Sequence, residues 1–326
     1  MKAYRVFDEG KYGSGRFCDM DRESLDAGNV VVRIAFASVN YKDALTARGK
    51  ARIALKFPLV AGIDVAGAVE TSADPRFKPG DPVIVHSFGL GVEHDGGYAE
   101  YGRFSADWLI PLPKGLSLFE ASALGVAGHT AALAVELMEL NGLAPANGRV
   151  LVNGATGGVA SIAIDILAGR GYQVVAMSGK AGAAEYLKGL GAQEVIGRAD
   201  AAGKERPLEP PLWAGAVDSV GGAQLAWLIR RMQRGGVIGA FGNAGGAEFA
   251  GNVLPFILRG VRLIGVNVNN PLATMQRIWE RLAGDLKPRH LERIAQRIRF
   301  EELETTFDDL LAARVTGRRV VDFSLG

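Results

Sequence analysis

The sequence has 326 residues, of which 48% are hydrophobic and 22% are charged, and its formal net charge is +2. This length is typical of two domains of roughly 100–200 residues each, and a charge so close to zero gives no electrostatic footprint for nucleic acid. No apolar run reaches the roughly 20 residues that a membrane-spanning helix needs, and the first ten residues lack the pattern of a secretory signal. We therefore expect no nucleic-acid or membrane partner and a cytoplasmic location.

Metal-ligating residue types are scarce. Cys18 is the only cysteine, and the four histidines are scattered at positions 86, 94, 129 and 290. A structural zinc site normally takes four Cys or His ligands at close spacings, which this chain does not offer. We expect no bound metal, and the lone cysteine fits a reducing compartment.

Predicted strands dominate the first third of the chain. Residues 30–40, 59–70 and 81–87 are rich in Val, Ile and Ala, and the turn sequence FKPGD separates the last two. The density of short strands favours a compact, barrel-like domain.

From about residue 120 the pattern changes to alternating helices and short buried strands, which predicts a parallel, doubly wound sheet. The last predicted strand of that sheet is VRLIGVNV at 261–268. The final segment, beginning at EELETTFDDLL, reads as a helix and a strand that return to the first domain, because six strands already complete a dinucleotide-binding sheet.

The most informative stretch is RVLVNGATGGVASIAIDIL at 149–167, where a buried strand leads into a small-residue turn and then a helix. The backbone N–H groups at a helix N-terminus can hold a pyrophosphate, provided that the turn is made of tiny side chains. Aligned to G-x-G-x-x-G, the matching residues are Ala155, Gly157 and Ala160, with Gly158 in addition, so alanine replaces two glycines. The alternative is a tight turn that binds nothing.

The second strand of this Rossmann-type unit indicates which dinucleotide binds. An NAD site usually has an acidic residue about 20 positions after the turn, to bind the ribose 2′-hydroxyl. Here the strand ends in Ser178, Gly179 and Lys180, and Arg198 follows the next strand. A hydroxyl, a backbone N–H and cations suit a 2′-phosphate, so we predict NADPH. The alternative for Lys180 and Arg198 is solvated surface charge.

These residues resemble the medium-chain dehydrogenase/reductases over almost the whole chain. Zinc-containing members carry an early catalytic cysteine and a Gly-His-Glu motif, where this chain has Asn40-Tyr41-Lys42-Asp43 and Gly62-Ile63-Asp64. It therefore resembles the zinc-free quinone oxidoreductase branch. SVNYKDAL, KFPLVAGIDVAG, DPRFKPGD, GGYAEYGR and GATGGVA followed by SGK are similar to the acrylyl-CoA reductase group.

The resemblance implies an α/β fold in which a GroES-like, β-rich catalytic domain (1–121) is joined to a Rossmann NADPH-binding domain (122–270), and 271–326 return to the first. It also implies a cytoplasmic homodimer. Cofactor contacts are implied at Tyr41 and Thr130 beside the nicotinamide, at Thr156, Gly157, Gly158 and Val159 on the pyrophosphate turn, at Ser178, Gly179, Lys180 and Arg198 around the 2′-phosphate, and at Asn243 and Val268 near the nicotinamide ribose and carboxamide. At the position of Lys180 the family more often has arginine. Lysine keeps the positive charge but cannot form the bidentate hydrogen bonds of a guanidinium group.

The chemistry that suits a reductase without zinc is conjugate reduction, since no metal polarises a simple carbonyl. Hydride enters the β-carbon of an activated alkene, charge spreads into an enolate, and a proton reaches the α-carbon. We take Tyr41 as the candidate for positioning or proton delivery, Asn40 as an amide donor, and Asp43 as a residue that orients them. Alternatively, Tyr41 only packs on the cofactor and Asp43 caps a helix.

The substrate class remains open at this stage. A short enoyl-CoA such as acrylyl-CoA is the leading hypothesis, and quinones or α,β-unsaturated ketones and aldehydes are the alternative. A non-catalytic NADPH-binding sensor is a remote third. Arg48, Lys50, Arg52 and Lys56 in the loop at 46–58 could meet the phosphates of coenzyme A, or they form a solvated basic loop.

Overall fold

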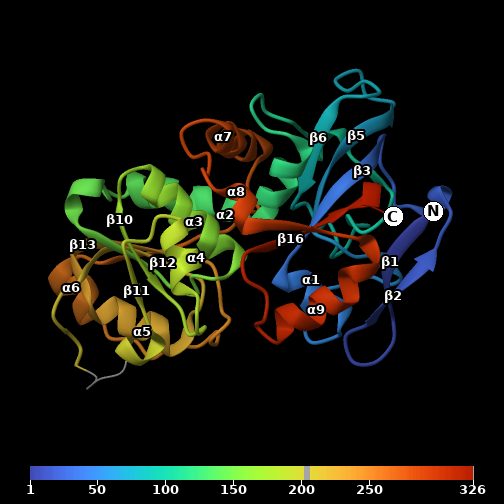
Figure 1. Cartoon of the computed structure of the whole chain (residues 1–326). Helices are drawn as coiled ribbons and strands as arrows, with labels where there is room; N and C mark the ends of the chain where they lie inside the picture. Colours follow the sequence, from blue (N-terminus) through green and yellow to red (C-terminus); the bar gives the residue numbers. More distant parts are fainter. Residues whose placement is uncertain (202–205, 326) are drawn as a thin grey trace. The chain divides into compact units, whose positions relative to one another are not determined.

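The computed structural model describes residues 1–201 and 206–325 (Figure 1). The chain forms two compact units. Unit 1 comprises residues 1–127 and 269–283 together with the chain from 291 onward, and unit 2 comprises the described part of 128–268 and the short segment 284–290.

The first boundary between the units lies after Ala127 and not at 121–122. Helix α2 (Leu118–Leu140) runs through the expected position, but Gly125 has non-helical dihedrals (φ 47°, ψ −149°), so α2 is two helices joined at this glycine. Its length and composition would allow it to cross a membrane, yet 78% of its most apolar window is buried within the protein, as in the core helix of a soluble protein.

The return of the chain after residue 270 also differs from the expectation, because residues 284–290 belong to unit 2. Polar contacts with helix α3 (Gly158–Gly169) and the residue after it hold this segment. Arg170 Nη1 donates to Asp285 at 2.9 Å, and Arg289 Nη2 donates to the Gly169 carbonyl at 2.8 Å. The backbone N–H of His290 donates to the buried carboxylate of Asp165 at 2.7 Å. The hydrophobic periodicity of the sequence does not predict that residues 284–290 belong to unit 2, because polar contacts hold them there.

Unit 2 contains the predicted parallel sheet, in the order β11-β10-β9-β12-β13-β14. The strands are β9 (Arg149–Val152), β10 (Gln173–Met177), β11 (Glu194–Ile196), β12 (Trp213–Asp218), β13 (Met232–Ala240) and β14 (Arg262–Gly265). The helices are α3, α4 (Ala184–Gly189), α5 (Gly222–Arg230) and α6 (Leu254–Arg259), together with most of α2. The middle strands are buried along nearly their whole length, as parallel strands covered on both faces must be.

Unit 1 is built from two sheets among the described residues. The smaller has the order β2-β1-β4, and the larger has the order β15-β16-β3-β5-β6-β8 with β7 also paired to β3. The strands are β1 (Lys2–Phe7), β2 (Ser14–Asp19), β3 (Val30–Val39), β4 (Leu59–Val60), β5 (Asp64–Ser72), β6 (Pro82–His86), β7 (Tyr101–Phe104), β8 (Ile110–Pro111), β15 (Ala295–Ile298) and β16 (Arg318–Asp322). Strand β16 runs antiparallel to β3, with Val320 opposite Ser38, so the C-terminal strand lies in the larger sheet of unit 1.

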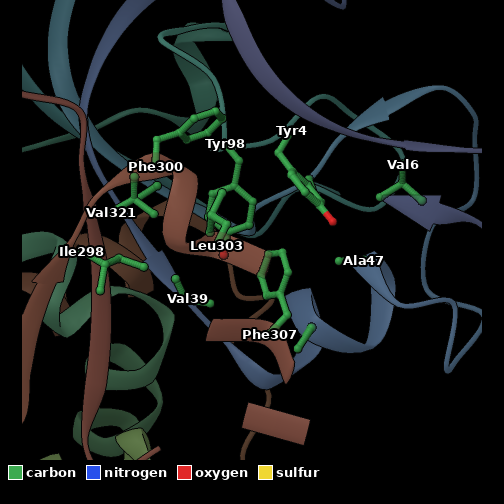
Figure 2. Packing of buried hydrophobic residues seen from close by; sticks show 13 residues of the cluster. Tyr4, Val6, Val39, Ala47, Tyr98, Ile298, Phe300, Leu303, Phe307 and Val321 are labelled. Carbon is green, nitrogen blue, oxygen red and sulfur yellow. The ribbon is translucent and has the colours of Figure 1, made fainter. Parts of the chain in front are cut away.

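Helices α1 (Tyr41–Ala47) and α9 (Leu303–Leu311) enclose one hydrophobic core of unit 1, while α7 (Leu272–Ala283) and α8 (Leu291–Ile294) complete the unit. Figure 2 shows Phe307 of α9 close to Tyr4 and Tyr98, with ring centroids 5.4 and 5.9 Å apart. This aromatic packing fixes α9, and the chain that follows it, against the N-terminal strands.

A second anchor joins α7 to strand β6. The indole N–H of Trp279 donates to His86 Nε2 at 2.9 Å, and both side chains are fully buried. His86 therefore has a structural role.

Candidate active site and cofactor-binding turn

The parallel register of unit 2 brings the turns that carry most of the predicted cofactor residues to one edge of the sheet. Val152 at the end of β9 pairs with Ala176 of β10 and Val217 of β12, and Ala240 at the end of β13 pairs with Gly265 of β14. All the turns that follow these strands therefore lie at the carboxyl edge, where doubly wound sheets bind their ligands.

The turn after β9 has the geometry that a pyrophosphate site requires. Gly154 has a φ of +57°, and a Cβ there would lie 2.2 Å from Ser219 Oγ, so only glycine fits. Gly157 is the exposed N-cap of α3, and its N–H bonds the Gly154 carbonyl at 2.8 Å. Helix α3 thus begins with its free N–H groups behind a turn without large side chains, which suits an anion.

A buried carboxylate that the sequence did not single out organises this edge. Asp218, fully buried at the end of β12, accepts from Asn153 Nδ2 and from the N–H of Gly221 at 3.1 Å. Asn153 Oδ1 in turn accepts the N–H of Ser219 at 2.8 Å. This network ties the pyrophosphate turn to the loop after β12, and its only sequence signal is a polar residue at the end of each of two apolar strands.

The candidate 2′-phosphate residues come together after β10 and β11. Ser178 donates its N–H to the carbonyl of Ile196 at 3.1 Å, and its Oγ accepts the N–H of Lys180 at 3.1 Å. A Cβ on Gly179 would lie only 2.8 Å from Arg198 Nε, so the Arg198 side chain lies directly against this glycine. The predicted hydroxyl and the Arg198 guanidinium therefore share one small region, with no acidic residue in the sequence from 178 to 183.

Three further predicted cofactor residues of unit 2 differ in exposure. Asn243 is exposed in the loop after β13, and this loop packs on Gly221, where a Cβ would lie 3.4 Å from the Asn243 Cα. Val268 is half-buried just beyond β14, and Thr130 is buried within α2.

In unit 1, the predicted catalytic residues stand at the start of α1. Tyr41 is the first residue of the helix and is 47% exposed. Asp43 is buried and accepts the N–H of Asn40 at 2.9 Å and the hydroxyl of Tyr98 at 2.9 Å. Asp43 therefore caps the helix, as the structural alternative required, and at the same time fixes Asn40.

Asn40 and Asp43 belong to a buried polar cluster, which we define as Ser38, Asn40, Asp43, Asp64, Tyr98 and Arg318. Asp64 of β5 accepts from the N–H of Ser38 at 2.8 Å, from Ser38 Oγ and from Asn40 Nδ2 at 3.1 Å. Arg318 of β16 donates from Nη1 to Asn40 Oδ1 at 2.9 Å. The Asn40 amide is thus engaged within the protein at both its oxygen and its nitrogen.

The break in α2 makes room for this polar cluster. A Cβ on Gly125 would lie 2.6 Å from Asp64 Oδ2 and 2.8 Å from Ser38 Oγ, and the positive φ also favours glycine. The break leaves backbone groups free to bond side chains. Val126 N–H donates to Asp64 at 3.3 Å, and the Ala123 carbonyl accepts from Arg318 Nε at 3.1 Å.

Burial shifts the pKa of three members of the polar cluster. Burial, and then the negative charge of Asp64, raise the pKa of Asp43 to about 7, while the hydrogen bonds from Asn40 and Tyr98 pull it down. Burial also raises the pKa of Tyr98 well above its usual range. Burial lowers the pKa of Arg318, but arginine stays charged in proteins.

Two expectations about charged and metal-ligating residues can be compared with the structure. In the basic loop, Arg48 is bonded to Asp308 at 2.9 Å and Lys56 to Asp26, so only Lys50 and Arg52 remain as exposed candidates for coenzyme A phosphates.

Across residues 1–201 and 206–325, no group of three or more His, Cys, Asp or Glu side chains could hold a metal ion.

Sequence reasoning gave no role to Arg318, and it noted Ser38, Asp64 and Tyr98 only as parts of motifs. The available signal was a polar residue within an otherwise apolar strand, as at Asp64 in LVAGIDVAGAVE. That signal marks a buried polar group but does not identify its partner.

We predict a pH dependence of stability that comes from Asp43. Between pH 4 and about 7 the carboxyl stays protonated in the folded protein but ionises in the unfolded chain, so the free energy of unfolding falls as pH rises. From pH 5 to pH 8 this loss should amount to about 1–3 kcal/mol. The groups that face this carboxyl belong to Asn40, Asp64, Tyr98 and Arg318. The variant Asp43→Asn leaves all four of these residues in place, so it removes only the titration of Asp43 itself.

The measurement is denaturant unfolding of wild type and Asp43→Asn at pH 5 and pH 8, with the exposed Asp8→Asn as control. Asp43→Asn should lose less stability than wild type between the two pH values, and Asp8→Asn should follow wild type. An identical loss in wild type and Asp43→Asn would show that Asp43 does not titrate in this range.

Comparison with known proteins agrees with this geometry. The Alcohol dehydrogenase GroES-like domain family matches residues 26–114, and the Zinc-binding dehydrogenase family matches residues 158–284. Together these matches span most of both units.

Three relatives are similar over nearly their whole length. The protein named Putative quinone oxidoreductase YhfP from Bacillus subtilis is 48% identical over 302 residues, or 92% of each chain. Its crystal structure with NAD bound superimposes with a TM-score of 0.95 over 99% of each chain. Acrylyl-CoA reductase AcuI from Ruegeria pomeroyi is 45% identical over 91% of each chain.

The YhdH oxidoreductase from Salmonella enterica, solved in complex with NADP, is 41% identical and has a TM-score of 0.95 over 99% of this chain and 100% of its own. The matched families, the level of identity and the shared fold lead to one conclusion. The chain belongs to the medium-chain dehydrogenase/reductase superfamily of oxidoreductases, in its zinc-free quinone oxidoreductase branch.

Proposed function

We propose that this protein is an NADPH-dependent reductase of the activated C=C bond of short enoyl-CoA thioesters such as acrylyl-CoA. The observation that carries the cofactor assignment is the arrangement of Ser178, Lys180 and Arg198 next to Gly179, with no acidic residue in the sequence from 178 to 183 after β10. The similarity to AcuI supports the substrate class.

The residues of unit 2 fit the cofactor. The first N–H groups of α3, behind Gly157 and Gly158, would bind the pyrophosphate. Lys180 and Arg198 would bind the 2′-phosphate together with Ser178 Oγ. Bound NADPH supplies a hydride, and the loops after β13 and β14, with Asn243 and Val268, would contact its nicotinamide end.

The residues of unit 1 supply the second half of the reaction. Hydride adds to the β-carbon of the thioester-conjugated alkene, and the electron pair of the double bond moves into the thioester carbonyl as an enolate. A proton must then reach the α-carbon. The hydroxyl of Tyr41, a half-exposed residue, is our candidate for its delivery, while Asn40 and Asp43 hold the start of α1.

One of the two alternatives has specific support. Reduction of quinones or unsaturated ketones and aldehydes is favoured by the name of YhfP and requires the same delocalisation of charge. A sensor that binds NADPH without turnover requires only unit 2. We further propose a cytoplasmic location, supported by a sequence with a single cysteine.

We predict that Lys180 and Arg198 give the preference for NADPH over NADH. Lys180→Ala and Arg198→Ala should each weaken NADPH binding by about 1–3 kcal/mol, the scale of a lost charge-assisted hydrogen bond, and should leave NADH binding nearly unchanged. Titration calorimetry with both cofactors measures this, with the exposed Lys188→Ala of α4 as control. Equal affinity of wild type for the two cofactors would refute the assignment.

The substrate assignment is tested by NADPH oxidation with a panel of acrylyl-CoA, crotonyl-CoA, simple enones and quinones. We expect the highest kcat/KM with a short enoyl-CoA. Tyr41→Phe should lower kcat about 100-fold if the hydroxyl delivers the proton, because general acid catalysis contributes on this scale. Much faster turnover of quinones would show that the protein is a quinone reductase instead. Binding of NADPH without any turnover would favour the sensor.

We also propose that the protein is a homodimer that pairs through unit 2. Strand β14 lies at the edge of the sheet formed by the described residues, and exposed apolar side chains gather on α6 and just before it. Val253 is 65% exposed, Ile257 70% and Leu258 49%. An exposed strand edge beside such a patch is a typical interaction surface.

Light scattering at micromolar concentration should give the mass of a dimer for wild type. Ile257→Asp should give a monomer, because it places a charge in the apolar patch. Leu140→Asp, which changes an equally exposed leucine at the end of α2, should remain a dimer. A monomeric wild type would overturn the proposal.

A further inference from the structure

The guanidinium of Arg318 is buried, with 3% of the residue exposed, and hydrogen bonds engage each of its three nitrogens. Nε donates to the Ala123 carbonyl at 3.1 Å, Nη1 donates to Asn40 Oδ1 at 2.9 Å, and Nη2 donates to Ser38 Oγ. A planar fork held at three points has one possible orientation. Arg318 is therefore a rigid element among the strands and the helix around it.

The hydroxyl of Ser38 bridges the guanidinium of Arg318 and its counter-ion, Asp64. The separation between Arg318 Nη2 and Asp64 Oδ2 is 4.0 Å, too long for a hydrogen bond. Ser38 Oγ accepts from Arg318 and donates to Asp64 Oδ2. Because arginine can only donate, the direction of both bonds is fixed, and the Ser38 proton must point to Asp64.

The same argument fixes the amide of Asn40. Its oxygen must face the donor Arg318, so its nitrogen faces the two carboxylates, Asp64 at 3.1 Å and Asp43 at 3.1 Å. Asp43 also accepts the backbone N–H of Asn40 at 2.9 Å. The residue that precedes α1 is thereby held by its backbone and by both ends of its side chain, and the next residue is the exposed Tyr41.

We infer that Arg318, Ser38 and Asp64 are positioning residues, which hold Asn40 and the start of α1 so that the Tyr41 side chain is presented to the substrate in one place. The inference rests on the proposed function. With Ser38 fully buried and Asp64 and Arg318 1% and 3% exposed, these residues act through Asn40 and do not touch the substrate.

Stability alone is a poor explanation for this arrangement. A buried ion pair gains little over well-packed apolar residues, since desolvation offsets much of the attraction. Here two carboxylates and a guanidinium are buried together, and a glycine break in α2 is needed to accommodate them. A network in which the hydrogen bonds of Arg318, Ser38 and the Asn40 amide oxygen have fixed directions does, however, specify a single geometry, and such precision is what a residue that meets a reacting group needs.

The test is a double-mutant cycle between Ser38→Ala and Tyr41→Phe, measured as kcat with the best acceptor of the panel. Ser38→Ala removes the bridging hydroxyl and little volume. It should lower kcat at least 10-fold and leave KM and NADPH affinity within about 3-fold, because only positioning in the transition state is lost. In the Tyr41→Phe background, Ser38→Ala should lower kcat by less than 3-fold.

Arg318→Lys keeps the charge but cannot reach three acceptors, so it should reproduce the effect of Ser38→Ala. Trp279→Phe, which removes a buried hydrogen bond elsewhere in unit 1, controls for general destabilisation and should leave kcat unchanged. Circular dichroism confirms that each variant is folded.

Three outcomes would overturn the inference. The first is a normal kcat in Ser38→Ala, and the second is that the effects of Ser38→Ala and Tyr41→Phe on kcat multiply independently. The third is a normal kcat in Tyr41→Phe, because the Tyr41 hydroxyl would then have no role that depends on its position. The wild-type rate with enoyl-CoA separately tests the proposed function. A wild type that prefers enones or quinones refutes the thioester assignment, while the cycle with that acceptor still decides the inference.

Discussion

The buried charge pair of Arg318 and Asp64 is the constraint on which much of unit 1 depends. A guanidinium placed in an apolar interior must find acceptors for its N–H groups and a counter-ion for its charge. In this protein those partners come from β3, β5 and the break in α2, so one side chain near the C-terminus joins segments from three other parts of the sequence. The core around Phe307 and Tyr98 supports this arrangement, because it fixes the chain that leads into β16 (Figure 2).

Unit 2 uses a buried acid in a similar way. Asp218 binds Asn153 and the loop after β12, so hydrogen bonds within the protein define the shape of the turn before α3. Gly154 and Gly157 then leave its surface open. In each unit, a fully satisfied polar network lies beneath an exposed group that we assign to function: the N-terminus of α3 in one and Tyr41 in the other. Preformed geometry of this kind reduces the reorganisation required during reaction.

Local signals in the sequence were sufficient for much of this account. Alternating buried strands and helices predict the parallel sheet, and the turn at 153–158 and the Ser178-Gly179-Lys180 sequence predict the cofactor edge. The rest depends on partners far apart in the sequence. Ser38 and Arg318 are 280 positions apart, and no local pattern links them. The boundary at 127 and the exchange of 284–290 depend on a glycine dihedral and on polar contacts such as His290 to Asp165, which hydrophobic periodicity does not encode.

The central claim is that the protein transfers a hydride from NADPH to the β-carbon of an enoyl thioester. The most direct measurement is the position of isotope in the product, after turnover of acrylyl-CoA with NADPH that carries deuterium in the transferable C4 position. We predict one deuterium on the β-carbon of the propionyl product and a solvent-derived hydrogen on the α-carbon, as resolved by NMR. Product without deuterium on the β-carbon, or labelled cofactor consumed without thioester reduction, would contradict the account.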